Sequence, residues 1–373
     1  MVYNPPPGIE PLRGHPRYTK IADLNRGSYG FVQLARDNAT GEEVAIKFIQ
    51  RGEKMAGRYV EREIVNHSML LHPHIIQFKE VFLTPEYLAI SMEYAKGGDM
   101  FQYVKAKGGL QEHEARWFFQ QLIIALDYAH RMNVVSRDIK LENTLLDGSR
   151  RPLLKICDFG YSKNTEKDSV PKSRVGTPGY TAPEVISQGN TGNYDGKAVD
   201  VWACGVMLFV MLFCQYPFER PEDEQEKIQT KRYQMQLQRV IRGDYKIPSR
   251  VKISEPCRDL LNRILQVNVA KRITIPEILK HKWFLTDLPR GLDTFNDVCM
   301  RQQADSSVLE DNKKHVASIV QEAKQGPGPG AQVNGEAISD HDNDDYTDYM
   351  EQDSMEFHES DGAPTAPAKA AAK

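Results

Sequence analysis

The stretch Ser-Arg-Asp-Ile-Lys-Leu-Glu-Asn at residues 136–143, followed by Asp-Phe-Gly at 158–160, decides the fold of this 373-residue chain. The first stretch places a carboxylate, an amine and an amide on one loop, at Asp138, Lys140 and Asn143. A second carboxylate opens the second stretch. One carboxylate can accept a hydroxyl proton, and the amine can steady a migrating phosphoryl group. The amide and the other carboxylate can hold magnesium, so the pattern predicts phosphoryl transfer.

Upstream of this loop, a glycine-containing turn lies between two predicted strands. Gly27 and Gly30 fit the end of a G-x-G-x-x-G-x-V pattern, with Asn25 in place of its first glycine. Glycine has no Cβ, so the backbone N–H groups of such a turn can approach phosphates closely. Strand-glycine-strand sequences are also common tight turns, so this motif alone is weak evidence for a nucleotide. The residues predicted to line the phosphates are Leu24, Asn25, Arg26, Gly27, Ser28, Tyr29, Gly30, Phe31 and Val32.

Lys47 is the single charged residue in the apolar strand predicted at 44–49. A buried lysine needs a partner, because burying an isolated charge costs several kcal/mol. Glu63, in the helix predicted at 59–71, is the natural partner, and the pair would present the ammonium to the phosphates of ATP. The alternative is a solvent-exposed lysine at a strand edge, and on this residue alone that alternative is the simpler one.

Length and composition set the broad class. The chain of 42.4 kDa has 40% apolar and 27% charged residues, enough to form one large or two modest domains. No apolar run approaches the roughly 18 residues that a membrane helix requires. The N-terminus lacks a signal-peptide pattern, and Val2 excludes N-myristoylation. These features predict a globular protein that is not secreted.

The five cysteines form no Cys-x-x-Cys pair and show no metal-ligand spacing. Reduced thiols are the simplest interpretation, and they are typical of a cytoplasmic or nuclear protein. We therefore expect the protein in the cytoplasm, the nucleus or both. The cysteines are Cys157, Cys204, Cys214, Cys257 and Cys299.

The order of the predicted elements indicates two lobes. An extended lead-in at 1–17 precedes a small β-rich lobe at 18–93, and residues 94–285 have the pattern of a larger helical lobe. Residues 112–131 repeat apolar side chains at helical period, and 199–213 is apolar nearly all round, as in a buried helix. The strands of the small lobe are predicted at 31–35, 44–49, 75–82 and 88–93.

The part after residue 285 divides into a regulatory helix region at 286–325 and an acidic tail at 326–373. A helix is predicted at 306–324, and the Gly-Pro-Gly-Pro-Gly run at 326–330 must stop it. Residues 325–368 contain 11 acidic residues and no Lys or Arg, which predicts disorder. The apolar face of the helix is predicted to comprise Val308, Leu309, Val316, Ile319 and Val320.

Together these motifs resemble a eukaryotic serine/threonine protein kinase over residues 18–285. Ala-Pro-Glu at 182–184 fits the end of a kinase activation segment, and we expect Glu184 to pair with Arg272. The sequence is similar in more detail to the sucrose-non-fermenting-related kinases, subfamily 2, of plants and green algae. That likeness is carried by residues 141–148, 155–163, 194–197 and 272–278. It implies an α+β, bilobal protein kinase fold, with a small antiparallel β lobe, one main helix and a large helical lobe.

The resemblance also implies roles for matching residues. Asp138 would be the catalytic base and Lys140 the lysine that contacts the phosphoryl group, with ATP and Mg²⁺ as cofactors. Asn143 and Asp158 would hold the metal. Asp99 and Glu142 resemble residues that recognise an arginine before the phosphorylated residue, which predicts an Arg-x-x-Ser/Thr preference. The other residues assigned to ATP are Ala45, Lys47, Glu63, Met92 as gatekeeper, and Glu93 and Ala95 at the hinge.

Arg137, next to the base, suggests control by phosphorylation of the activation segment, because a guanidinium can order that segment by binding a phosphate. The predicted phosphosites are Ser169, Ser173 and Thr177. Ser169 aligns best with the activating serine of the family, whereas Thr177 more often shapes the substrate platform. Ordinary loop serines are the alternative.

Two departures from the kinase pattern leave a second interpretation open. Kinases carry His where this chain has Ser136, and Asn25 replaces a glycine, so the chain could be a pseudokinase that binds nucleotide or partners without catalysis. A nucleic-acid-binding module has little support, because the body is only mildly basic. The resemblance implies stress or nutrient signalling and protein substrates. It also implies protein phosphatases and upstream kinases as partners of the C-terminal region, with no nucleic acid or membrane.

Overall fold

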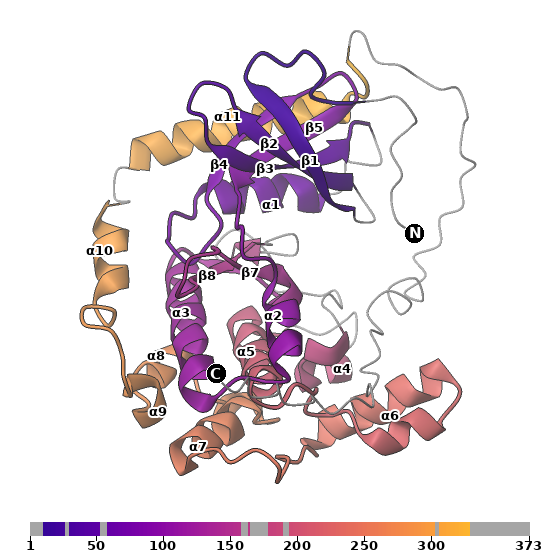
Figure 1. Ribbon diagram of the computed structural model, residues 1–373, viewed down its shortest axis with the longest axis vertical. Helices are drawn as coiled ribbons and strands as arrows, with labels where there is room; N and C mark the ends of the chain where they lie inside the picture. The colour runs from indigo at the N-terminus through magenta and orange to yellow at the C-terminus, as the bar shows by residue number, and fades with distance from the viewer. Residues whose placement is uncertain are drawn as a thin grey trace, which may run out of the picture. The chain divides into compact units, whose positions relative to one another are not determined.

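The small lobe is a five-stranded antiparallel sheet in the order β1-β2-β3-β5-β4, with α1 packed on one face (Figure 1). Its elements are β1 (Tyr18–Arg26), β2 (Gly30–Asp37), β3 (Glu43–Gln50), α1 (Arg58–Ser68), β4 (Phe78–Leu83) and β5 (Tyr87–Glu93). Val, Ile and Phe side chains fill β2 and β3, and such side chains favour a pleated, half-buried strand. The computed structural model describes residues 10–26, 30–52, 58–157, 163–164, 178–188, 194–302 and 306–328.

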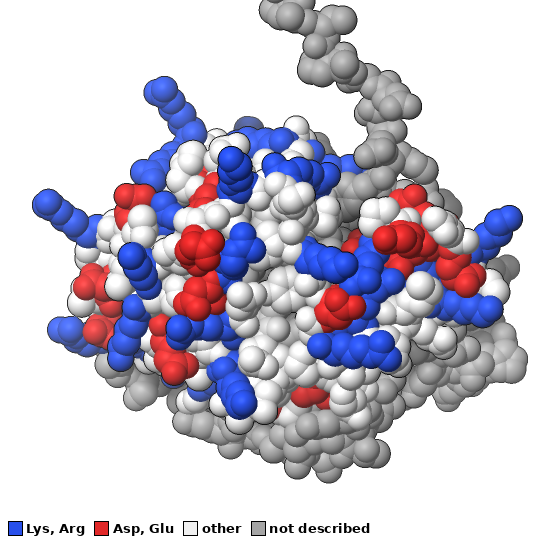
Figure 2. Space-filling view, turned by 90° about the horizontal axis from the view of Figure 1, so that it is seen from below, with Lys and Arg blue, Asp and Glu red and all other residues white. Residues whose placement is uncertain are grey.

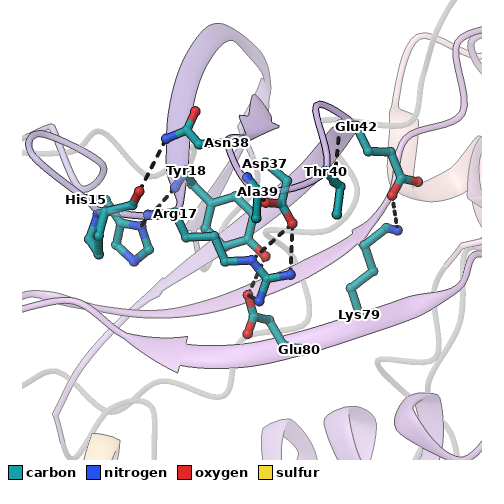
Figure 3. A network of polar contacts seen from close by, with 11 residues as sticks. His15, Arg17, Tyr18, Asp37, Asn38, Ala39, Thr40, Glu42, Lys79 and Glu80 are labelled. Atoms are coloured by element: carbon teal, nitrogen blue, oxygen red, sulfur yellow. Dashed lines mark hydrogen bonds and ion pairs between the residues drawn. The ribbon is translucent and has the colours of Figure 1, made fainter.

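The segment before β1 packs on the sheet instead of forming an extended lead-in. Residues 11–14 form a turn. Leu12 is only 4% exposed and packs on the face of the sheet that lies opposite to α1. Arg17 fixes the end of the segment, because its guanidinium bonds Asp37 at 2.8 and 3.0 Å and lies 3.0 Å from Glu80 (Figure 3). The prediction for residues 10–17 was wrong because one buried leucine outweighs the local proline signal. Residues 1–9 lie outside the described part.

The predicted helix α11 (Ser306–Lys324) packs on the small lobe beside α1 and β4 (Figure 1). Val316 and Val320 are fully buried against α1, β4 and β5, and Lys324 Nζ lies 2.8 Å from Glu61 on α1. Ile319 is partly buried in the same cluster. The helix ends before the glycine-proline run, as predicted. The side chains of Val308 and Leu309 lie outside the described residues.

The large lobe is built around two long helices, α3 and α5. Its helices are α2 (Met100–Lys107), α3 (Glu112–Arg131), α4 (Pro183–Gln188), α5 (Gly196–Phe213), α6 (Gln229–Arg242), α7 (Glu255–Ile264), α8 (Ile275–Ile278), α9 (Lys282–Leu285) and α10 (Phe295–Gln302). Short antiparallel pairs join β6 (Val134–Val135) to β9 (Lys163–Asn164) and β7 (Thr144–Leu146) to β8 (Leu154–Ile156).

Helix α5 is long and apolar enough to meet the length and composition of a membrane span, yet most of it is buried inside the large lobe. Its side chains belong to the same core cluster as those of α3, so it is the central helix of this lobe. The surface of the lobe carries charges of both signs, which are interleaved on the face seen in Figure 2. Several are paired, as Arg263 is with Asp259 at 3.0 Å.

Two predicted element boundaries differ from the structure. The strand expected at 75–82 is β4 at Phe78–Leu83, because Ile75 and Ile76 are drawn into a loop that pairs with Ile156. The helix expected at 59–71 ends at Ser68. Both differences arise from contacts with the large lobe, which the local pattern does not contain.

Candidate active site

One buried carboxylate on α5 binds the backbone of the loop at 136–143. Asp200 is 0% exposed and accepts hydrogen bonds from the backbone N–H groups of Ser136 (3.0 Å) and Arg137 (2.7 Å). It also accepts a bond from His130 Nε2 at 2.8 Å. Arg137 has a φ of 65°, a strained conformation for a side chain of this size. The carboxylate therefore fixes a backbone shape that the loop would not adopt alone.

This fixed loop presents Asp138 to its two neighbours in the predicted motif. Asn143 Nδ2 donates to Asp138 Oδ2 at 2.7 Å and to the Asp138 carbonyl at 3.2 Å. Lys140 Nζ lies 3.6 Å from the same carboxylate oxygen. The three groups that sequence analysis placed on one loop are therefore in contact, with the carboxylate oriented from one side and balanced by a cation.

Asp158 lies outside the described residues, but its attachment point is described. Strand β8 pairs with β7 in the register Thr144 to Ile156, and the Cys157 N–H donates to the Asn143 carbonyl at 3.1 Å. The described strand β8 therefore ends at Ile156, and the next residue, Cys157, bonds the backbone of Asn143. With Nδ2 committed to Asp138, the Asn143 amide keeps its oxygen for another ligand, and amide oxygen suits Mg²⁺.

On the small-lobe side, the predicted pair of Lys47 and Glu63 is in contact. Lys47 Nζ lies 2.8 Å from Glu63 Oε1, and the glutamate side chain is 15% exposed. The lysine lies in the centre of β3 and the glutamate on α1, so the pair can form only when α1 lies close to the sheet. A half-buried ammonium held in this way can bind phosphate oxygens while staying charged.

The register of β3 and β5 sets the position of the predicted hinge residues. Ala45 on β3 pairs with Met92 on β5, which places both at the edge where the sheet meets the large lobe. The Glu93 N–H donates to the Gln77 carbonyl at 2.9 Å, and its carboxylate lies 2.6 Å from Lys155 Nζ. Within the described residues, the N–H and C=O of Ala95 have no hydrogen-bond partner. These two groups are free to bind the edge of a flat, polar ring.

The glycine turn is described only at its two flanks. Leu24, Asn25 and Arg26 end β1, while Gly30, Phe31 and Val32 begin β2. A Cβ on Gly30 would lie 1.9 Å from the Phe48 carbonyl oxygen, so only glycine fits there. The Asn25 side chain accepts from the adjacent Arg26 N–H at 2.8 Å, at the end of β1. Gly27, Ser28 and Tyr29 lie outside the described residues.

The two predicted recognition carboxylates have different surroundings. Glu142 accepts hydrogen bonds from the hydroxyl groups of Tyr180 and Tyr216, both at 3.3 Å. Burial raises the pKa of both tyrosines, so these hydroxyls stay protonated donors at neutral pH. Asp99 instead caps α2 by accepting from the Gln102 N–H at 2.8 Å. Glu142 is therefore an oriented anion, and Asp99 has a structural task as well.

The predicted structural pair of Glu184 and Arg272 is present and buried. Two parallel hydrogen bonds join the side chains at 2.6 and 2.8 Å, and the side chains are 6% and 1% exposed respectively. Arg272 also donates to the Ala198 carbonyl at 2.9 Å and lies over the Trp202 ring. This pair ties α4, at the end of the activation segment, to the core of the large lobe.

Sequence analysis missed one residue of the site, Asp200. It could have been found, because a lone carboxylate in an apolar helix needs a buried partner. The predicted phosphosites Ser169, Ser173 and Thr177 lie outside the described residues.

Ser136, the departure from the kinase pattern, is 1% exposed, and its Oγ is buried without a hydrogen-bond partner among the described residues. We expect Ser136→His to keep or raise activity, because histidine is the residue that the kinase pattern carries at this position. Ser136→Ala is the matched control, and losing an unpaired hydroxyl should change the free energy of unfolding by no more than about 1 kcal/mol. Kinase assays and thermal unfolding check both. A large loss of activity in Ser136→His would show that the surroundings have adapted to serine.

The small lobe supplies the ion pair of Lys47 and Glu63, and the large lobe supplies the loop of Asp138 and Asn143. A strand lysine held by a helix glutamate, together with a loop aspartate and asparagine, is the arrangement of a protein kinase. The chain belongs to the protein kinase family: the family model described as "Protein kinase domain" matches residues 18–284. This match ends at α9, so α10 and α11 lie beyond it.

Curated relatives narrow the family further. The chain is 49% identical over 315 residues to the serine/threonine-protein kinase SRK2H of Arabidopsis thaliana, covering 84% of each protein. It is 47% identical to SRK2A of Physcomitrium patens, covering 90% of this chain and 93% of the relative. It is also 49% identical to SAPK1 of Oryza sativa subsp. japonica, over 86% of this chain and 90% of the relative. The chain is thus a serine/threonine-protein kinase like those of subfamily 2 of the plant sucrose-non-fermenting-related kinases.

Proposed function

We propose that the protein transfers the γ-phosphoryl group of Mg-ATP to serine or threonine side chains that follow an arginine. The observation that carries this proposal is that both pairs of the kinase pattern are in contact, Lys47 with Glu63 in the small lobe and Asp138 with Asn143 in the large lobe. Asp138 takes the proton of the substrate hydroxyl, whose oxygen bonds to the γ-phosphorus while the bond to the bridging oxygen of ADP breaks. Lys140 offsets the charge on the migrating group.

The described residues fit the proposed ligands. The free backbone groups of Ala95 suit adenine, Lys47 suits the phosphates, and the Asn143 amide oxygen suits Mg²⁺ together with Asp158. Bound magnesium would neutralise phosphate charge. The experiment that tests the proposal is transfer of labelled phosphate from ATP to a serine peptide, with and without Mg²⁺. Absence of transfer by fully phosphorylated protein would favour the pseudokinase alternative.

That alternative is weaker than catalysis on present observations. It rested on Asn25 and Ser136. Asn25 bonds the adjacent Arg26 N–H at the end of β1, and Ser136 keeps the backbone bond to Asp200 that shapes the loop. The groups described on the loop, Asp138, Lys140 and Asn143, keep the contacts that catalysis requires.

Substrate choice is proposed to depend on Glu142. Because two tyrosine hydroxyls orient its carboxylate, it can receive an arginine guanidinium without losing its position. We expect a peptide with Arg three residues before the serine to have a kcat/KM about tenfold above that of the Ala peptide, the effect of one charged hydrogen bond. Glu142→Gln should remove most of that ratio and leave turnover of the Ala peptide unchanged. Asp99→Asn tests the second predicted recognition residue in the same way. Equal turnover of both peptides by the wild-type protein rules the arginine preference out.

Regulation is proposed to act through phosphorylation of Ser169. Arg137 directly precedes the proposed base, and its guanidinium can bind a phosphate. A phosphoserine adds one to three charge-assisted hydrogen bonds, so Ser169→Ala should lower kcat about tenfold or more. The check is activity after treatment with an upstream kinase, with Ser162→Ala as the matched control. Undiminished activity in Ser169→Ala excludes this serine as the switch.

The remaining proposals concern biological setting. The contact of α11 with α1 supports a regulatory role for residues 286–325, because whatever moves α11 would move the helix that carries Glu63. We propose protein phosphatases and upstream kinases as partners of this region and of the acidic tail, stress or nutrient signalling as the context, and cytoplasm or nucleus as the location. Truncation at Gln325 followed by a phosphatase binding assay tests the role of the tail.

A further inference from the structure

A buried polar chain connects α10, which lies beyond the family match, to the loop between α1 and β4. Asn296 on α10 is 4% exposed, and its Nδ2 donates to the Ile124 carbonyl (2.9 Å) and to Asp127 Oδ2 (2.8 Å), both on α3. Two acceptors on one side fix the orientation of the amide. Its oxygen must therefore face the other side, where His72 Nε2 lies 3.2 Å away.

This orientation sets the protonation of His72. Because the Asn296 oxygen can only accept, Nε2 carries the hydrogen, and Nδ1 accepts from the His74 N–H at 3.1 Å. Both ring nitrogens are used, and burial lowers the pKa of His72 to about 3, so the ring stays neutral. The ring also stacks on Tyr128 of α3, with centroids 5.0 Å apart, and meets the edge of Phe295.

The loop that His72 anchors reaches both halves of the active site. His67, one turn after Glu63 on α1, has its Nε2 2.7 Å from the Ile76 carbonyl at the end of the loop. The Ile76 N–H donates to the Ile156 carbonyl at 2.8 Å, two residues before Asp158. In this way the loop contacts both the helix of the ATP-orienting glutamate and the strand that leads to the metal-binding aspartate.

We infer that Asn296 is a positioning residue for catalysis, which acts through His72 to hold the α1–β4 loop, and through that loop the helix of Glu63 and the end of β8 at Ile156. The loop is also tied to β8, since Lys155 Nζ donates to the Pro73 carbonyl at 3.0 Å and His74 Nδ1 to the Leu154 carbonyl at 3.0 Å. The residues of those bonds lie within the family match at 18–284, whereas Asn296 lies after it. The inference rests on the ATP-dependent transfer proposed above.

The test compares Asn296→Ala with wild type at matched phosphorylation, with KM for ATP and KM for the peptide measured separately. We expect KM for ATP to rise and kcat to fall, lowering kcat/KM for ATP about tenfold, the effect of one buried hydrogen bond. KM for the peptide should not change, because Glu142 lies away from the loop. A smaller folded fraction would lower the apparent kcat and leave both KM values as they are.

Two further variants separate positioning from simple attachment of α10. Asp297→Ala removes a surface pair on the same helix, between Asp297 and Arg131 at 2.6 Å, and should behave as wild type. His72→Phe keeps a ring against Tyr128 and Phe295 but loses both nitrogen contacts, so it should raise KM for ATP and lower kcat as Asn296→Ala does. It provides the same test if Asn296→Ala fails to fold. The double variant should be no worse than His72→Phe alone. Wild-type kinetics in His72→Phe, or equal effects of Asn296→Ala and Asp297→Ala, overturn the inference, while an inactive wild type overturns the proposed function instead.

Discussion

Replacing Asp138 with asparagine is expected to lower kcat by about 10²- to 10⁴-fold, the range for loss of a positioned general base. The change is nearly isosteric, and the amide oxygen of the new side chain can still accept the bond from Asn143 Nδ2. The loop should therefore keep its shape, because Asp200 holds the backbone at Ser136 and Arg137 independently of this side chain. What disappears is the charge that we propose receives the substrate proton.

Single-turnover transfer of labelled phosphate to an arginine-containing serine peptide measures this loss. ATP affinity, followed by a fluorescent nucleotide, is the control and should change little, since the adenine and phosphate contacts lie elsewhere. Asp259→Asn provides a matched carboxylate-to-amide change at an exposed residue of α7 and should retain most of the rate. Comparable rates for wild type and Asp138→Asn would remove Asp138 from the role of base.

Replacing Arg272 with methionine is expected to destabilise the large lobe by about 3–5 kcal/mol, the cost of removing one member of a buried ion pair. The Glu184 carboxylate is 6% exposed and would remain buried without its two hydrogen bonds. Methionine keeps the apolar stem of the side chain, so most of the loss comes from the stranded charge. Urea unfolding followed by circular dichroism gives the change in free energy.

Two variants make this measurement selective. Arg263→Met breaks an exposed pair with Asp259 and should change stability by no more than about 1 kcal/mol. Combining Arg272→Met with Glu184→Gln neutralises the stranded carboxylate and should recover part of the lost stability. A loss below about 1 kcal/mol for Arg272→Met would mean that water reaches Glu184 when the guanidinium is gone.

Much of the fold was predictable because its strongest signals are local. The apolar period of α3, the nearly all-apolar α5 and the β-branched strands β2 and β3 appear where the sequence pattern placed them. The lysine–glutamate pair was predictable for a different reason. A lysine inside an apolar strand requires a carboxylate, and Glu63 lies on the first helix that follows.

The parts that sequence analysis missed depend on contacts between distant segments. In the sequence, Leu12 lies in a proline-rich segment, and the apolar surface on which it packs exists only in the folded sheet. His72 and Asn296 are 224 residues apart, and neither residue type alone signals a partner. Ile75 and Ile76 have strand-like side chains, but their backbone groups pair with β8 in the other lobe. Local propensity cannot register such competition.

The covering of the small-lobe sheet has a consequence for how the chain can be divided. One face is closed by Leu12, ahead of the kinase match at 18–284, and the other by Val316, Val320 and Ala323 of α11, which follow it. A fragment cut at the borders of the family would leave both faces partly bare, and contiguous apolar surface of that kind promotes self-association. We therefore expect the unit that stays monodisperse in solution to be larger than residues 18–284, because the flanking segments cover apolar faces of the sheet.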